Sequence, residues 1–177
     1  MGYAVSWLAI RGNTETSLLA SLALEKTGET EEIAESAWSA TNVREWLVVW
    51  SNSCQPKGFR DAGSKLPGEV VICDIEEHVM FSSVAFFNNG TLSWRITHDA
   101  QEANDHLLVE GQPPESLAHI QAAQFARVGE DREVDFIFDI PVRVAQEIVG
   151  FRHDGASSAA FEVLRVTSGN KSRWNLW

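Results

Sequence analysis

The chain lacks the residue patterns of the common catalytic and metal-binding motifs. It has only two cysteines in 177 residues, Cys54 and Cys73, and their spacing does not match a zinc site. A glycine-rich phosphate loop and a Gly-x-Ser-x-Gly nucleophile turn are both missing. We therefore expect no bound metal, no cofactor and no catalytic residue of a recognisable class. The two cysteines are expected to be free thiols, as in a reducing cytoplasm.

Long apolar runs and a secretory leader are also missing. No stretch approaches the roughly 18 apolar residues of a membrane-spanning helix. The first residues, 1–7, have no basic segment before their apolar stretch, unlike a signal peptide. These absences predict a cytoplasmic protein that does not enter a membrane.

Basic residues are scarce as well. Lys and Arg number 14 against 25 Asp and Glu, so the formal net charge is −11. An acidic surface repels nucleic acid phosphates and anionic lipids, and it accelerates encounter with a basic protein. We therefore expect a protein partner and no nucleic acid.

Periodicity predicts an α+β fold of one domain, with a mainly antiparallel sheet covered by two or three helices. Acidic loops are expected over 25–37 and 129–135, a loop or short helix over 51–68, and a loosely held tail over 168–177. Strands are predicted over 3–11, 45–50, 70–75, 105–110 and 160–166, helices over 15–24, 116–128 and 142–149, and a short strand or extended piece over 136–138.

A long central hairpin over about 77–99 is the best-specified element. Asn89-Gly90 is the preferred pair for a two-residue type I′ turn, so Asn88 should pair with Thr91. One face of the hairpin is then expected to form core, and its members alternate along the two strands. They are Val79, Phe81, Ser83, Ala85, Phe87, Leu92, Trp94, Ile96 and His98.

The other face gathers polar side chains at the open end of this hairpin. In the predicted register Asp99 is opposite Met80 and diagonal to His78, which shares a face with Glu76. A Glu/His/Asp group can bind a divalent metal or orient a histidine as a general base. The simpler interpretation is an ion-paired or partner-binding end of the sheet. Arg152, His153 and Asp154 follow a predicted helix stop, and they could form a surface turn or supply side chains to a nearby pocket.

The acidic segments are the candidate partner-binding surface. An exposed aromatic side chain among them would be a suitable contact anchor. The residues are Glu29, Glu31, Glu32, Glu35, Trp38, Glu130, Asp131 and Glu133.

Residues 76–83 and 135–141, together with 151–154, resemble a group of uncharacterised bacterial proteins of similar length. That resemblance covers most of the chain and implies no activity. In its general character, small, acidic and without motifs, the chain is also similar to bacterial toxin-immunity proteins. The sequence thus predicts a cytoplasmic protein that neutralises a basic toxin or effector by direct binding. The alternative is a small enzyme or metal-binding protein that uses Glu76, His78 and Asp99.

Overall fold

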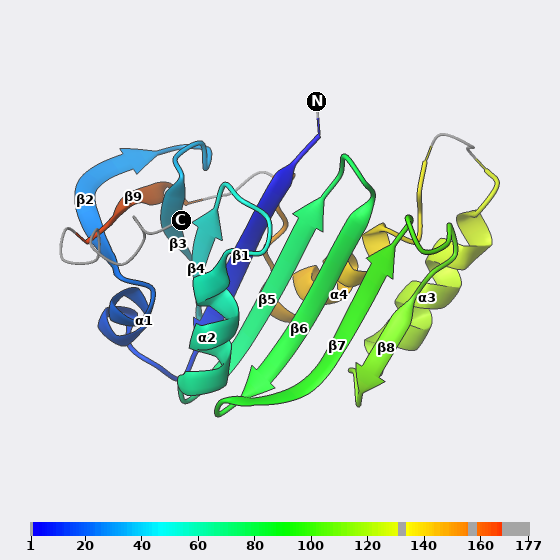
Figure 1. Ribbon diagram of the computed structural model, residues 1–177, viewed down its shortest axis with the longest axis horizontal. Helices are drawn as coiled ribbons and strands as arrows, with labels where there is room; N and C mark the ends of the chain where they lie inside the picture. Colours follow the sequence, from blue (N-terminus) through cyan, green and yellow to red (C-terminus); the bar gives the residue numbers. More distant parts are fainter. Residues whose placement is uncertain (1, 131–133, 156–158, 168–177) are drawn as a thin grey trace, which may run out of the picture.

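A single antiparallel sheet of nine strands forms the centre of the computed structural model (Figure 1), which describes residues 2–130, 134–155 and 159–167. The strand order is β2-β9-β3-β4-β1-β5-β6-β7-β8, so β2 and β8 are the two edges. The strands are β1 (Ala4–Arg11), β2 (Leu24–Glu31), β3 (Trp38–Val43), β4 (Trp46–Ser51), β5 (Glu69–Glu76), β6 (Phe81–Asn88), β7 (Thr91–Asp99), β8 (Leu108–Gly111) and β9 (Phe161–Val166).

Helices cover both faces of this sheet, two on each. They are α1 (Glu15–Ser21), α2 (Lys57–Lys65), α3 (Ser116–Arg127) and α4 (Asp139–Val149). Figure 1 shows α2 in front of the sheet and α4 behind it. The predicted α+β class is confirmed, with four helices in the described part of the chain where two or three were expected. None of those helices is long and apolar enough to cross a membrane.

Each face of the sheet has its own hydrophobic core. Successive residues of a strand point to opposite faces, so β5 sends Val71 and Cys73 to one core and Val70 and Ile72 to the other. The larger core is covered by α3 and α4, and it also contains Trp7, which is fully buried. Burial on both sides explains why the central strands are apolar almost without interruption.

Helix ends follow the signals in the sequence. The Thr14 hydroxyl accepts a hydrogen bond from the Ser17 N–H at 3.2 Å, the expected N-cap of α1. Gly150 ends α4 with φ of +82°, a conformation that disfavours side chains with a Cβ. However, α4 begins at Asp139, and residues 136–138 form a turn where an extended piece was predicted.

The prediction of an acidic loop over 25–37 is wrong for most of that range. Residues Leu24–Glu31 form the edge strand β2, and Trp38 begins β3. Strand β9 lies between them and pairs with both. The register of β2 shifts between Lys26 and Thr30, and such a bulge, together with charged side chains, protects an edge strand from pairing with other chains.

The predicted hairpin is present, but its register changes near the turn. Asn89 and Gly90 both have positive φ, and Asn88 pairs with Thr91 as expected. One extra residue, Ser93, then shifts the pairing by one, so that Phe86 is opposite Trp94 and Asp99 is opposite Phe81. The predicted core face is therefore divided between the two sides of the sheet.

The hairpin also starts later than predicted. Glu77–Met80 is a tight turn between β5 and β6, and Met80 adopts a positive φ of 52°. Glu76 thus belongs to β5 and His78 to a turn, so these two do not lie on a strand that pairs with Asp99.

Candidate functional site

A pocket of about 670 Å³ opens on the same face of the sheet as α4. Five parts of the chain line it: Tyr3 near the N-terminus, residues 32–34 after β2, Trp50 of β4, residues 151–155 after α4, and 159–161 at the start of β9. Its volume is within the range of pockets that bind small molecules or side chains.

His153 is one of the polar residues of the pocket wall. Its side chain is 1% exposed, and Nε2 lies 3.3 Å from Glu77 Oε1. The ring of Tyr3 packs against it edge to face, with centroids 5.1 Å apart. Burial lowers the pKa of His153, which keeps the ring neutral at neutral pH. If Nε2–H donates to Glu77, Nδ1 has a free lone pair, and among the described residues it has no hydrogen-bond partner.

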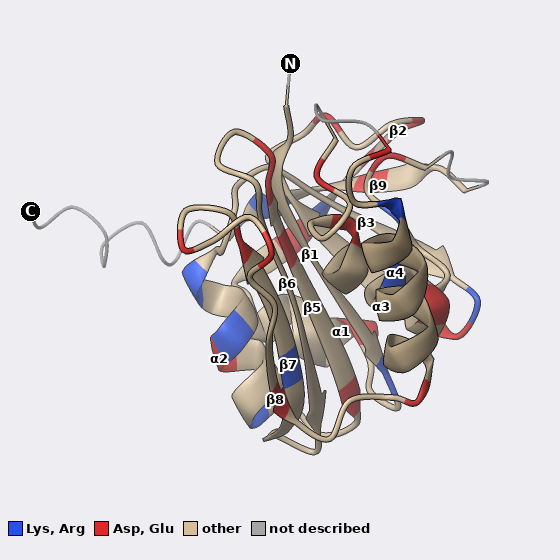
Figure 2. Ribbon diagram, turned by 90° about the vertical axis from the view of Figure 1, so that its right-hand side faces the viewer, with Lys and Arg blue, Asp and Glu red and all other residues tan. Residues whose placement is uncertain are grey.

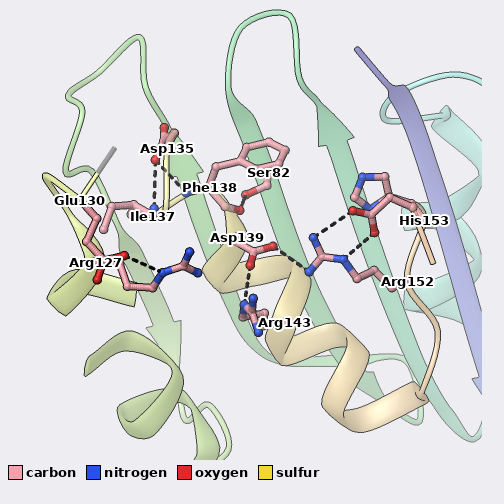
Figure 3. A network of polar contacts seen from close by, with 11 residues as sticks. Ser82, Arg127, Glu130, Asp135, Ile137, Phe138, Asp139, Arg143, Arg152 and His153 are labelled. Carbon is pink, nitrogen blue, oxygen red and sulfur yellow. Dashed lines mark hydrogen bonds and ion pairs between the residues drawn. The ribbon is translucent and has the colours of Figure 1, made fainter. Parts of the chain in front are cut away.

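Arg152 is enclosed by carboxylates (Figure 3). Its guanidinium lies 2.7 Å from Asp139 Oδ1 and 2.5 Å from Asp154 Oδ1. Asp139, the first residue of α4, also pairs with Arg143 one turn later. Partial burial alone would raise the pKa of Asp154, but the hydrogen bond from Arg152 and the charges beside it together outweigh burial, and the pKa is lowered. The positive charge of Arg152 is therefore neutralised within the protein.

The acidic segment around the end of β2 borders the pocket. Glu29, Glu32 and Glu35 are exposed, and Figure 2 shows acidic positions in the loops around β2, whereas α2 carries basic ones. Glu31 is less available, because its carboxylate accepts hydrogen bonds from the Ser36 N–H and hydroxyl. Glu32 makes no hydrogen bond or ion pair with any other described residue.

The other predicted partner-binding residues do not join this segment. Trp38 is half-buried and packs on Phe59 of α2, with ring centroids 5.7 Å apart, so it contributes to the core as well as the surface. Glu130 pairs with Arg127 at the end of α3. Asp131, Glu133 and the tail over 168–177 lie outside the described residues.

Glu76, His78 and Asp99 do not form the predicted group of three. His78 Nδ1 lies 2.6 Å from Glu76 Oε1, which leaves an exposed pair. Asp99 is held elsewhere: its carboxylate accepts from the Gln101 N–H, and its own N–H donates to His106 Nδ1. The described residues contain no group of three or more His, Cys, Asp or Glu side chains that could hold a metal.

A second buried histidine, His98, has both ring nitrogens occupied by groups of the protein. His98 is completely buried, with Nδ1 2.7 Å from the carbonyl oxygen of His106 and Nε2 2.9 Å from Asp135 Oδ2. Both ring nitrogens of His98 therefore lie within hydrogen-bond distance of an oxygen atom of the protein. Asp135 Oδ1 also accepts from the N–H groups of Ile137 and Phe138 (Figure 3). Every hydrogen-bonding atom of the ring is occupied, so this centre anchors the chain before α4 and offers nothing to a ligand.

The two cysteines are free thiols, as predicted. Burial raises the pKa of Cys54 to about 11 and also raises the pKa of Cys73 well above its ordinary value, so neither is a thiolate near neutral pH. Nearby Asp74 is also buried, and burial raises its pKa while Ser6 and Ser83 donate hydrogen bonds to it. Both oxygens of the Asp74 carboxylate are thus occupied by serine hydroxyls.

No protein-family model matches the chain. Comparisons with curated proteins and with solved structures likewise find no significant match. The resemblance to small bacterial proteins therefore stays an expectation, and the case for a function depends on the pocket and the acidic segment themselves.

Proposed function

We propose that this chain is a binding protein that recognises a basic protein partner through the acidic segment at the end of β2 and the pocket beside it. One observation carries the proposal: Glu32 and Ile33 belong both to the acidic segment and to the pocket wall. Charge and concavity thus form one continuous surface, which is the arrangement expected of a specific recognition site.

Exposed apolar side chains on this surface support the same proposal. Ile33 is 70% exposed and Tyr3 is 43% exposed, and both line the pocket. Apolar and aromatic groups inside a charged rim resemble the central anchors of protein interfaces, where desolvated contacts supply most of the affinity. The carboxylates around them would steer and orient the partner.

The specific form of the proposal is a cytoplasmic immunity protein that neutralises a basic toxin or effector. The free thiols and net charge of −11 support a cytoplasmic protein with a basic partner. A catalytic alternative at Glu76, His78 and Asp99 has less support, because Asp99 is engaged away from the other two.

Co-expression with the products of the neighbouring genes would test the proposal. We expect a 1:1 complex with one basic product, weaker at high salt, and protection of cells if that product is toxic. A triple change, Glu29→Lys, Glu32→Lys and Glu35→Lys, should weaken the complex at least tenfold, because attraction becomes repulsion.

The matched control reverses three exposed acidic residues elsewhere: Glu102→Lys, Asp105→Lys and Glu147→Lys. This variant has the same net charge as the first one. Equal weakening by both variants would mean that total charge matters and the proposed surface does not. No complex with any neighbouring product would contradict the immunity role.

A further inference from the structure

The pocket has walls suited to a flat cation. Trp50, Phe151 and Phe161 supply aromatic surface, and Tyr3 extends it to the rim. Phe151 packs edge to face on both Trp50 and Phe161, which holds these rings in a rigid cluster. Aromatic faces attract cations, and a guanidinium group also stacks on them because it is planar.

The charges in and behind the pocket wall are mainly negative. Glu32 and Asp154 line it, and Glu77 lies directly behind His153. Arg152 also lines the pocket, but its positive charge is shared between the carboxylates of Asp139 and Asp154. Because His153 is neutral, it adds no positive charge. The unpaired carboxylate of Glu32 is thus free to meet a ligand.

We propose that this pocket receives the guanidinium group of an arginine side chain supplied by the partner. The carboxylate of Glu32 accepts its N–H donors at the rim, while the aromatic cluster contacts its flat face. Nδ1 of His153, buried in the adjoining wall 3.9 Å from Asp154 Oδ1, has no hydrogen-bond partner among the described residues. This inference rests on the proposed function, since it names the group that the recognition surface selects.

A small probe tests the pocket without the partner. N-acetyl-arginine methylamide should bind the full chain with a dissociation constant in the millimolar range and shift the amide NMR signals of Ile33, Trp50 and His153. The citrulline analogue has the same shape without the charge, and it should bind at least tenfold more weakly. The lysine analogue should fall between them, because its ammonium cannot stack.

Matched variants show where on the protein the arginine probe binds. Glu32→Gln should weaken the arginine probe about fivefold, whereas Glu102→Gln, an exposed position outside both the pocket and the acidic segment, should leave its affinity unchanged. Equal binding of arginine and citrulline probes, or shifts confined to residues outside the pocket, would overturn the inference. A partner that still binds in that case would leave the proposed function standing. If the arginine probe binds specifically but no basic partner is found, the pocket inference would stand and the proposed function would be contradicted.

Discussion

Two buried histidines, His98 and His153, differ in whether their surroundings are closed or border the proposed recognition site. Each is at least nine-tenths buried, and each contacts a carboxylate. His98 has an acceptor at both ring nitrogens, while His153 has one at Nε2 and none at Nδ1 among the described residues. His98 lies between the sheet and the chain before α4, whereas His153 lines a pocket.

The comparison teaches that burial alone does not identify function. A buried group with all hydrogen bonds made contributes to stability, and replacing it leaves its partners unsatisfied. A buried polar atom without a partner costs stability, and such costs are concentrated where a protein binds or reacts. We therefore expect substitutions at the two histidines to affect different properties.

The largest effect on stability is expected at His98, where both ring nitrogens have partners. His98→Ala would leave the Asp135 carboxylate and the His106 carbonyl without their shared donor, and should lower the free energy of unfolding by about 3 kcal/mol. Urea unfolding followed by tryptophan fluorescence would measure it. The control is His78→Ala, an exposed histidine that should change stability by less than about 0.5 kcal/mol. Similar free energies of unfolding for the two variants would show that the buried contacts of His98 contribute no more to stability than an exposed histidine does.

A smaller effect, dependent on pH, is expected at His153. Burial lowers the pKa of His153 in the folded protein below the ordinary 6.5, so the unfolded chain binds the proton more readily. Stability from this group is then complete above about pH 6.5 and is lost as the pH falls below that value. The charged neighbours are Glu77, Asp154 and Arg152.

His153→Phe keeps the buried ring and removes the titration. The difference in stability between wild type and variant should therefore change with pH just below 6.5 and stay constant above it. Unfolding titrations at pH 5, 6, 7 and 8 would measure this difference. A constant offset at all four values would show that His153 binds protons equally in the folded and unfolded states.

The smallest effect on stability is expected at the rim of the pocket. Glu32→Gln removes no contact within the described structure, so the free energy of unfolding should change by less than about 0.5 kcal/mol. The same variant is expected to weaken binding of the arginine probe. A marked loss of stability would mean that Glu32 has a structural role, as His98 does, and is not a free rim residue.

The local signals in the sequence predicted local structure well. Thr14, Asn89-Gly90 and Gly150 each produce the cap, turn or stop that their backbone preferences favour. The bulge at Ser93 has no such signal, because any residue can occupy it, and one extra residue reverses the faces of all that follow. The predicted site of Glu76, His78 and Asp99 was wrong as a group for this reason and because the turn begins at Glu77.

Contacts between distant segments were beyond prediction. Edge strand β2 is rich in charge and has little alternation, so it resembles a loop in sequence, and only pairing with β9 makes it a strand. Arg152 and His153 were identified as candidates because they follow the stop at Gly150. Tyr3, Trp50 and Phe161 were not, since each reads as an ordinary strand or core residue until β9 places them together.

The insertion of β9 between β2 and β3 has a consequence for biosynthesis. The Thr27 hydroxyl donates to the Val163 carbonyl across 136 positions of sequence, so β2 cannot pair with β9 until residues 161–166 have left the ribosome. Domains begin to fold during synthesis, but contacts this distant form late. Residues 32–34 and 159–161, which both line the pocket, are therefore brought together only after β9 has been made. A nascent chain would have most of its sheet before this pocket could form.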